Sequence, residues 1–203
     1  AANARRLAPD CALAASPVTL GPRFNPHAPG LPQSADPRQG ALFGAAWLAG
    51  SLKHLAEAGV GSVTYAQAVG PRGVMPAEGE GVYPVYRLLA WLAAWREARV
   101  QPVSSSAPLC AVALALRQGR RLALLLANLT ATPQPVLLQP LAGVARLWRL
   151  NEMSATQAGR DPQAWEAQQL ERLPATHGAL ALLLWPYETA WVEGLQMAPR
   201  EVC

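Results

Sequence analysis

The hydrophobic pattern of the chain changes character near residue 99. Before this point strand-like and helix-like segments alternate, whereas after it short strand-like segments follow one another with turns between them. Alternating strands and helices normally build a parallel sheet with crossover helices, and a series of short strands builds an antiparallel sandwich. We therefore predict two domains, an α/β domain over residues 1–99 and an antiparallel β-sandwich over residues 100–203.

The first domain contains two predicted strands and two predicted helices. Residues 11–20 form a nearly continuous apolar run, as in a strand buried on both faces, and residues 61–65 form a second, shorter strand. A helix is predicted over residues 36–59, from an aspartate cap to a glycine, and another over residues 84–98. A β/α barrel needs eight strands, so we expect the missing N-terminal barrel strands upstream of Ala1.

The second domain is predicted to hold about seven short strands. Proline, glycine and asparagine residues mark the breaks between them, and Gly119 lies in a short hairpin connection. Residues 152–166 are polar and irregular and are predicted to form one long loop. The predicted strands cover residues 110–117, 121–128, 136–139, 145–151, 168–173, 179–185 and 189–193.

Composition excludes several classes of protein. The chain is 51% hydrophobic and 15% charged, which excludes intrinsic disorder, and no apolar run reaches the roughly 18 residues of a membrane span. Its 16 arginines are scattered along the sequence rather than gathered, so we expect no nucleic-acid partner. The three cysteines lack metal-ligand spacing, and we expect no metal and no cofactor. Without a recognisable secretory signal, the expected location is the cytoplasm.

Candidate site residues follow the two predicted strands of the first domain, because ligands of β/α sheets bind beyond the carboxyl ends of the strands. Arg23, Asn25 and His27 follow the first strand, and Gln67 and Arg72 follow the second. An arginine can donate two parallel hydrogen bonds to a carboxylate, and a side-chain amide both donates and accepts hydrogen bonds. This set therefore suits a polyhydroxylated or anionic ligand. The alternative is structural: such residues also fix the backbone of proline-rich loops, and a single loop histidine is commonly solvated.

The seven tryptophans allow a second interpretation. Trp148, Trp185 and Trp191 lie in the predicted sandwich, where they would either stack on carbohydrate or fill the core. The first alternative would make the sandwich a carbohydrate-binding module, and the second fits a sandwich that docks against the barrel. The sequence leaves both open.

A series of short segments follows in order along the chain: Ser16-Pro-Val-Thr-Leu, Arg23-Phe-Asn-Pro, Asp36-Pro-Arg-Gln, Leu42-Phe-Gly-Ala-Ala-Trp, Ser62-Val-Thr-Tyr, Arg72-Gly-Val-Met, Leu124-Leu-Leu-Ala-Asn-Leu-Thr and Leu184-Trp-Pro-Tyr. In these segments the chain resembles bacterial D-apionate lactonases. The resemblance covers most of the chain and implies a glycoside-hydrolase-like TIM barrel with a C-terminal β-sandwich, of which this chain would be the C-terminal part with the last two βα units. It also implies a small-molecule partner, the lactone of the branched sugar acid D-apionate.

The resemblance also suggests roles for individual residues. Arg72 would stabilise the oxyanion or hold the product carboxylate while water attacks the lactone carbonyl, and Tyr65 would line the same pocket. Where the family has a glutamate this chain has Gln67, which neither takes nor gives a proton at neutral pH. Three interpretations remain open: part of a lactonase that is inactive alone, a non-catalytic binding or docking module, and a decayed glycoside-hydrolase-like protein.

Overall fold

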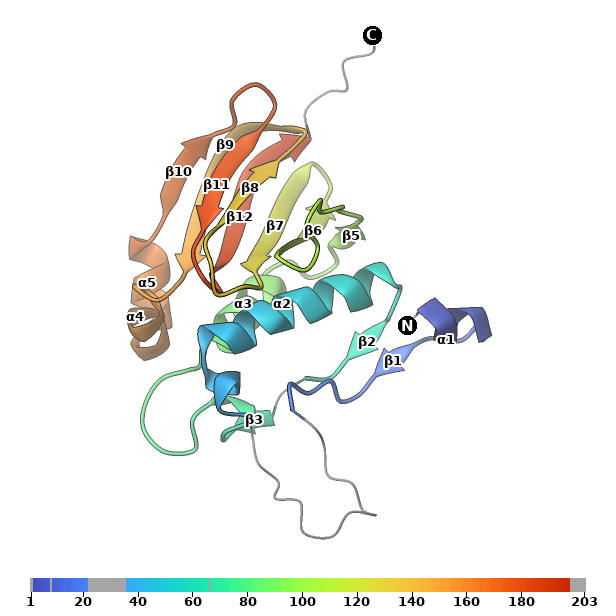
Figure 1. The fold of residues 1–203 in the computed structure, drawn as a ribbon, viewed down its shortest axis with the longest axis vertical. Helices are drawn as coiled ribbons and strands as arrows, with labels where there is room; N and C mark the ends of the chain where they lie inside the picture. The colour runs from blue at the N-terminus through green and yellow to red at the C-terminus, as the bar shows by residue number, and fades with distance from the viewer. Residues whose placement is uncertain (1, 8, 22–35, 66, 198–203) are drawn as a thin grey trace.

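The computed structural model describes residues 2–7, 9–21, 36–65 and 67–197 (Figure 1). Within these ranges no helix is both long and apolar enough to span a membrane. The elements of the first half are α1 Ala2–Leu7, β1 Ala14–Ala15, the 3-10 helix η1 Pro37–Gly40, α2 Leu42–Glu57, β2 Ser62–Val63, β3 Gln67–Val69, β4 Gly73–Met75 and α3 Pro84–Ala93. Those that follow are β5 Arg99–Gln101, β6 Ala111–Gln118, β7 Arg121–Asn128, β8 Gln134–Leu138, β9 Leu141–Leu150, α4 Ala155–Arg160, α5 Pro162–Gln168, β10 Glu171–Pro174, β11 Leu180–Leu184 and β12 Thr189–Met197.

Strands β1 and β2 pair in parallel, and η1 and α2 lie between them in the sequence. This β-α-β order confirms the predicted α/β organisation. The strand predicted over residues 11–20 is shorter than expected, although backbone bonds continue the ladder, with Thr64 N donating to Ala15 O and Val18 N to Thr64 O. Pro17 lacks an N–H and cannot join that ladder, which accounts for the short strand.

The helix predicted over residues 36–59 begins later than expected, because the separate 3-10 helix η1 occupies its first residues. Asp36 accepts a hydrogen bond from Arg38 N at 2.9 Å and so caps η1, after which the chain is extended at Ala41 before α2 begins. A side chain at Gly40 would place its Cβ 2.8 Å from the Tyr83 ring, so glycine is needed where η1 ends. The predicted end is confirmed, since Gly59 follows α2 with φ +74°.

Helix α2 is buried on two sides. Figure 1 shows it between the β1–β2 pair and the large sheet, and α2 contacts β6 and β7 of that sheet. Its small residues allow this close packing: Ala45, Ala46 and Ala49 are at most 1% exposed, and a Cβ on Gly50 would lie 3.4 Å from Leu129. Residues 42–50 of the helix are apolar on every side, as is typical of such a buried position, and its polar residues follow in the second half.

The second half forms the predicted antiparallel sheets. Six strands lie in the order β10-β9-β12-β7-β6-β5, and β11 and β8 form a separate pair. The six-stranded sheet has a core on each face: Leu122, Leu124 and Leu126 pack in the core that includes β8 and β11, whereas Leu125 and its neighbours pack in the core that includes α2 and α3. The β-domain is therefore continuous with the helices of the first half.

The loop predicted over residues 152–166 is wrong, because the structure places α4 and α5 there. Asp161 accepts from Ala164 N at 2.9 Å and Pro162 is the first residue of α5, so the signal is the same aspartate–proline pair that begins η1. Trp165 on α5 is fully buried. Burial of this tryptophan, more than helix propensity, stabilises so short a helix.

Candidate functional site

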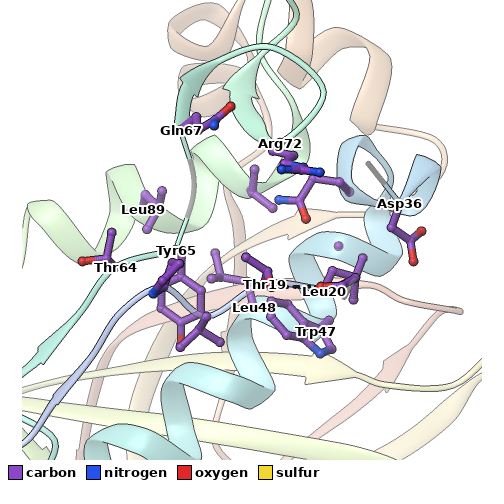
Figure 2. A pocket seen from close by; sticks show the side chains of 16 residues that line it. Thr19, Leu20, Asp36, Trp47, Leu48, Thr64, Tyr65, Gln67, Arg72 and Leu89 are labelled. Atoms are coloured by element: carbon purple, nitrogen blue, oxygen red, sulfur yellow. Dashed lines mark hydrogen bonds between the residues drawn. The ribbon is translucent and has the colours of Figure 1, made fainter. Parts of the chain in front are cut away.

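A cavity of about 170 Å³ lies where β1 and β2 end (Figure 2). Its wall combines residues that follow β1, residues that follow β2, and residues of α2 and α3. The lining combines apolar side chains of α2 and α3 with polar side chains of the segments that follow the two strands. Among the lining residues are Thr19, Leu20, Asp36, Gln39, Trp47, Leu48, Thr64, Tyr65, Gln67, Arg72, Val85 and Leu89.

Gln67 and Arg72 are held together by the short β3–β4 ladder. Gln67 N donates to Arg72 O at 3.2 Å, and Gly73 N donates to Gly70 O at 2.8 Å, which closes a tight turn. Gly70 has φ +103° and a Cβ on Gly73 would lie 2.8 Å from the backbone, so both turn positions require glycine. The backbone of these two residues is thus held at one end of the cavity.

Arg72 is half-buried, and no other described residue bonds to its side chain. Its carbonyl is used by Gln67, but its five N–H donors have no acceptor within the described part of the chain. Gln67 is exposed. This end of the cavity therefore holds the guanidinium of Arg72 and the neutral amide of Gln67, which together suit a carboxylate or a developing oxyanion.

Tyr65 forms a rigid side of the cavity rather than its polar end. Its hydroxyl lies 2.8 Å from Ser51 Oγ on α2, and its ring meets Trp47 edge-on with centroids 6.3 Å apart. Burial raises the pKa of Tyr65 above its ordinary value, and the bond to Ser51 offsets only part of that effect. Tyr65 lines the predicted pocket, with its hydroxyl already bonded to α2.

Asp36 is the single carboxylate among the described residues that line the cavity. Arg38 donates to it through Nε at 3.0 Å, Nη2 at 2.7 Å and the backbone N–H at 2.9 Å. The side-chain bonds from Arg38, followed by the backbone bond, lower the pKa of Asp36 to about 2. A carboxylate with so low a pKa is a weak base at neutral pH, so Asp36 is poorly suited to activate water. Sequence reasoning identified its cap role but not its place beside the cavity.

Three of the predicted site residues, Arg23, Asn25 and His27, fall outside the described residues. Over the parts of the chain that are described, no group of three or more histidine, cysteine, aspartate or glutamate side chains could hold a metal ion.

The three tryptophans considered as a sugar platform do not share one surface. Trp191 is 2% exposed and belongs to the core between the sheet and the helices, and Trp148 is half-buried on the same face. Trp185 is 51% exposed and follows β11. Two of the three are therefore core residues, as the structural alternative predicted.

Several solved structures similar to this chain are described as carbohydrate-active hydrolases. The chain is similar to a GH30 endoxylanase from Clostridium papyrosolvens C71 (TM-score 0.58, 10% identity, 79% of this chain and 39% of that one). It is similar to a glycoside hydrolase family 44 xyloglucanase from Paenibacillus polymyxa (0.57, 11%, 96% and 34%) and to the family 30 subfamily 8 xylanase Xyn30A from Clostridium acetobutylicum (0.56, 10%, 82% and 41%). The chain thus spans well under half of these structures, and the likeness shows the fold: a TIM-barrel part followed by an antiparallel β-domain.

Two models of protein-family domains match the chain. Residues 1–97 match the D-apionate lactonase TIM barrel domain, and residues 108–192 match the D-apionate lactonase C-terminal immunoglobulin-like domain. The chain therefore belongs to the D-apionate lactonase family, as the resemblance predicted. No match to a curated protein was found. The placement of the domain boundary at residues 99 and 100 stays a prediction.

Proposed function

We propose that the protein carrying this chain opens a sugar-acid lactone, with D-apionate lactone as the expected substrate. The observation that carries the proposal is the Arg72 guanidinium, which lines a cavity at the strand ends with no partner among the described residues. An arginine fork at this position suits both the oxyanion formed during lactone hydrolysis and the carboxylate of the product. Family membership supports the same substrate class.

In the proposed reaction, water adds to the lactone carbonyl carbon while a general base takes its proton. The carbonyl oxygen becomes an oxyanion that accepts hydrogen bonds from Arg72. The tetrahedral intermediate then collapses, the bond to the ring oxygen breaks, and the ring oxygen takes a proton to give a hydroxy acid. Asp36 is too weak a base for the first step, so we assign the base to a residue outside the described cavity wall.

Gln67 is proposed to hold a substrate hydroxyl or the attacking water. An amide both donates and accepts, so it can orient either group without exchanging a proton. Substitution Gln67→Glu introduces the residue found at this position in the family by resemblance. If a carboxylate at this position assists proton transfer, the variant will turn over faster than the natural protein.

The test is steady-state ring opening of D-apionate lactone by the full-length protein, measured as acid release at constant pH. Arg72→Ala is expected to lower kcat/KM by roughly tenfold or more, as loss of one positioned donor does. Arg172→Ala, an exposed arginine of β10, is the matched control and should leave the rate unchanged. Equal rates in the two variants would remove Arg72 from the mechanism, and no ring opening by the natural protein or by Gln67→Glu would contradict the lactonase proposal.

We also propose that the activity is located in the cytoplasm and contributes to the breakdown of apiose. Fractionation of the native bacterium with an antibody to the chain would test the location. Loss of growth on apiose after deletion of the gene would test the pathway.

A further inference from the structure

A groove of about 180 Å³ lies at the end of the six-stranded sheet where the chain turns from β6 into β7. Arg120 and Arg121 of this hairpin, Arg146 of β9 and Glu193 of β12 line the groove, together with Trp95, which follows α3. None of these residues lines the cavity at the strand ends. A water molecule takes up about 30 Å³, so the groove has room for a group of several heavy atoms.

A β-bulge in β12 shapes this groove. Glu193 accepts a hydrogen bond from the Trp95 indole and so lies on the face of the sheet that α3 covers, whereas Leu195 packs in the core on the opposite face. Residues two apart in a regular strand share a face, and the extra residue Gly194 breaks that rule. Gly194 has φ +84°, and a Cβ there would lie 2.8 Å from the Val144 carbonyl oxygen. The bulge therefore requires glycine, and a residue without a side chain follows Glu193 along the groove.

The Glu193 carboxylate organises the residues around it. Its Oε1 accepts from the indole N–H of Trp95 at 2.9 Å and of Trp191 at 2.8 Å, and its Oε2 accepts from Arg146 Nη2 at 2.6 Å. The Arg121 guanidinium lies 4.7 Å from the centroid of the Trp95 ring. Glu193 thus neutralises Arg146 and fixes the ring that Arg121 contacts, so two arginines of the groove are positioned by the protein itself.

Arg120 and Arg121 have no carboxylate of their own. Both residues are exposed, and neither side chain forms a hydrogen bond or an ion pair with another described residue. The N–H donors of their two guanidinium groups are therefore available to a ligand. Because Glu193 is already paired with Arg146, the groove has an excess of positive charge, which favours an anion.

Arginines from other strands add to this charge. Arg172 of β10 lies directly opposite Arg146, and Arg99 of β5 lies directly opposite Arg117 of β6, next to the hairpin. Like charges that face one another across a strand pair are destabilising. The fold therefore gathers arginines that are scattered along the sequence, and an anion in the groove would reduce the repulsion between Arg146 and Arg172.

From the two unpaired arginines, their fixed surroundings and the size of the groove, we propose that the groove binds the phosphate group of a small molecule. A carboxylate offers two oxygens, which a single arginine can occupy with two parallel hydrogen bonds. A phosphate monoester offers three oxygens and a charge of about −1.5 to −2 at neutral pH. Two unpaired arginines beside a third therefore suit phosphate better than carboxylate. The site is separate from the strand-end cavity and does not depend on lactonase activity.

The experiment uses the full-length protein labelled with ¹⁵N in its tryptophan side chains. Inorganic phosphate is added at constant ionic strength, and indole N–H resonances are followed by NMR after assignment with single Trp→Phe variants. We expect a saturable shift of the Trp95 resonance with a Kd in the millimolar range or below, because this ring contacts Arg121 and its N–H bonds to Glu193. Trp185 does not line the groove, and its resonance should stay in place. Succinate, a dicarboxylate, should bind at least tenfold more weakly than phosphate.

Three arginine variants locate the binding. Arg121→Gln and Arg120→Gln each remove one unpaired guanidinium from the groove, and Arg6→Gln removes an exposed arginine of α1 that does not line it. We expect each groove variant to weaken phosphate binding by about tenfold or more, and the control to leave it unchanged. All three side chains are exposed, so the variants should fold like the natural protein.

Three outcomes would overturn the proposal. The first is the absence of a saturable Trp95 shift with phosphate at constant ionic strength. The second is equal phosphate affinity in the groove variants and the control, which would place the anion elsewhere. The third is equal affinity for succinate and phosphate, which would remove the preference for phosphate. None of these outcomes bears on ring opening, so failure of this proposal is distinguishable from failure of the proposed lactonase function.

Discussion

The two regions of this molecule bury their residues differently. In the β-domain, the central strand β7 has seven consecutive residues that are buried, because β6 and β12 flank it and both faces of the sheet are covered. Strands β1 and β2 span two residues each and pair only with one another among the described residues. The candidate catalytic residues follow the sparsely paired strands, and the extensively packed sheet contributes none of the described residues that line that cavity.

The difference shows that the residues of the buried core and the residues of the candidate site lie in different parts of the fold. Helices α2 and α3 contact the large sheet on one side and line the strand-end cavity on the other. The sheet therefore holds the two helices in place, and the helices in turn support the cavity wall. A packed scaffold that positions functional loops is the general arrangement of enzyme sites.

The sharpest test of this comparison substitutes one leucine in each region. Leu125 is 1% exposed in β7, whereas Leu89 of α3 is half-buried beside the cavity. Leu125→Ala is expected to lower the free energy of unfolding by about 2 to 5 kcal/mol, because the closed core cannot collapse around the lost side chain. Leu89→Ala should cost clearly less, since its site is already open. Urea denaturation of the full-length protein measures both, and equal losses would contradict the contrast between the regions.

Sequence patterns predicted the β-domain best. The strand predicted over residues 121–128 has the observed bounds of β7, and a leucine-rich segment that begins directly after a glycine turn leaves few alternatives. Strand β5 was missed because its three residues carry no alternation of their own and are strand only by pairing with β6. Helices α4 and α5 were missed although Asp161 and Pro162 signalled a helix start, because their polar sequence is helical largely through burial of Trp165.

The candidate site was predictable only where its residues share one strand end. Tyr65, Gln67 and Arg72 follow β2 within eight residues of the sequence and converge on one cavity. The approach of Asp36 to that cavity depends on how η1 packs, which no local pattern records. The same holds for the ion pair between Arg87 of α3 and Glu166 of α5, which are distant in the sequence and become neighbours only in the folded chain.

A smaller effect is expected for the bond that ties β2 to α2. Tyr65→Phe removes the hydroxyl that lies 2.8 Å from Ser51 Oγ and leaves the ring against Trp47. The expected loss is about 1 kcal/mol in the free energy of unfolding, the usual net contribution of one hydrogen bond. Ser51→Ala should cost a similar amount, and the double variant should cost less than the sum of the two. Strictly additive losses in urea denaturation would show that the two hydroxyls do not interact.

The smallest expected effect concerns the pair Asp36–Arg38 at the rim of the cavity. The pKa of Asp36 in the folded protein is about 2, below its ordinary value of 3.8, because Arg38 bonds to the carboxylate. Folding therefore favours the ionised form, so its stabilising contribution is present above about pH 4 and is lost as the pH falls from 3.8 toward 2. The contribution is small because the Arg38 side chain is 58% exposed to solvent. An NMR titration of the Asp36 carboxyl should give a pKa of about 2 in the natural protein and a higher value in Arg38→Gln, still below 3.8 because the backbone N–H of residue 38 continues to donate to the carboxylate. An unchanged value in the variant would show that the Arg38 side chain does not control this carboxylate.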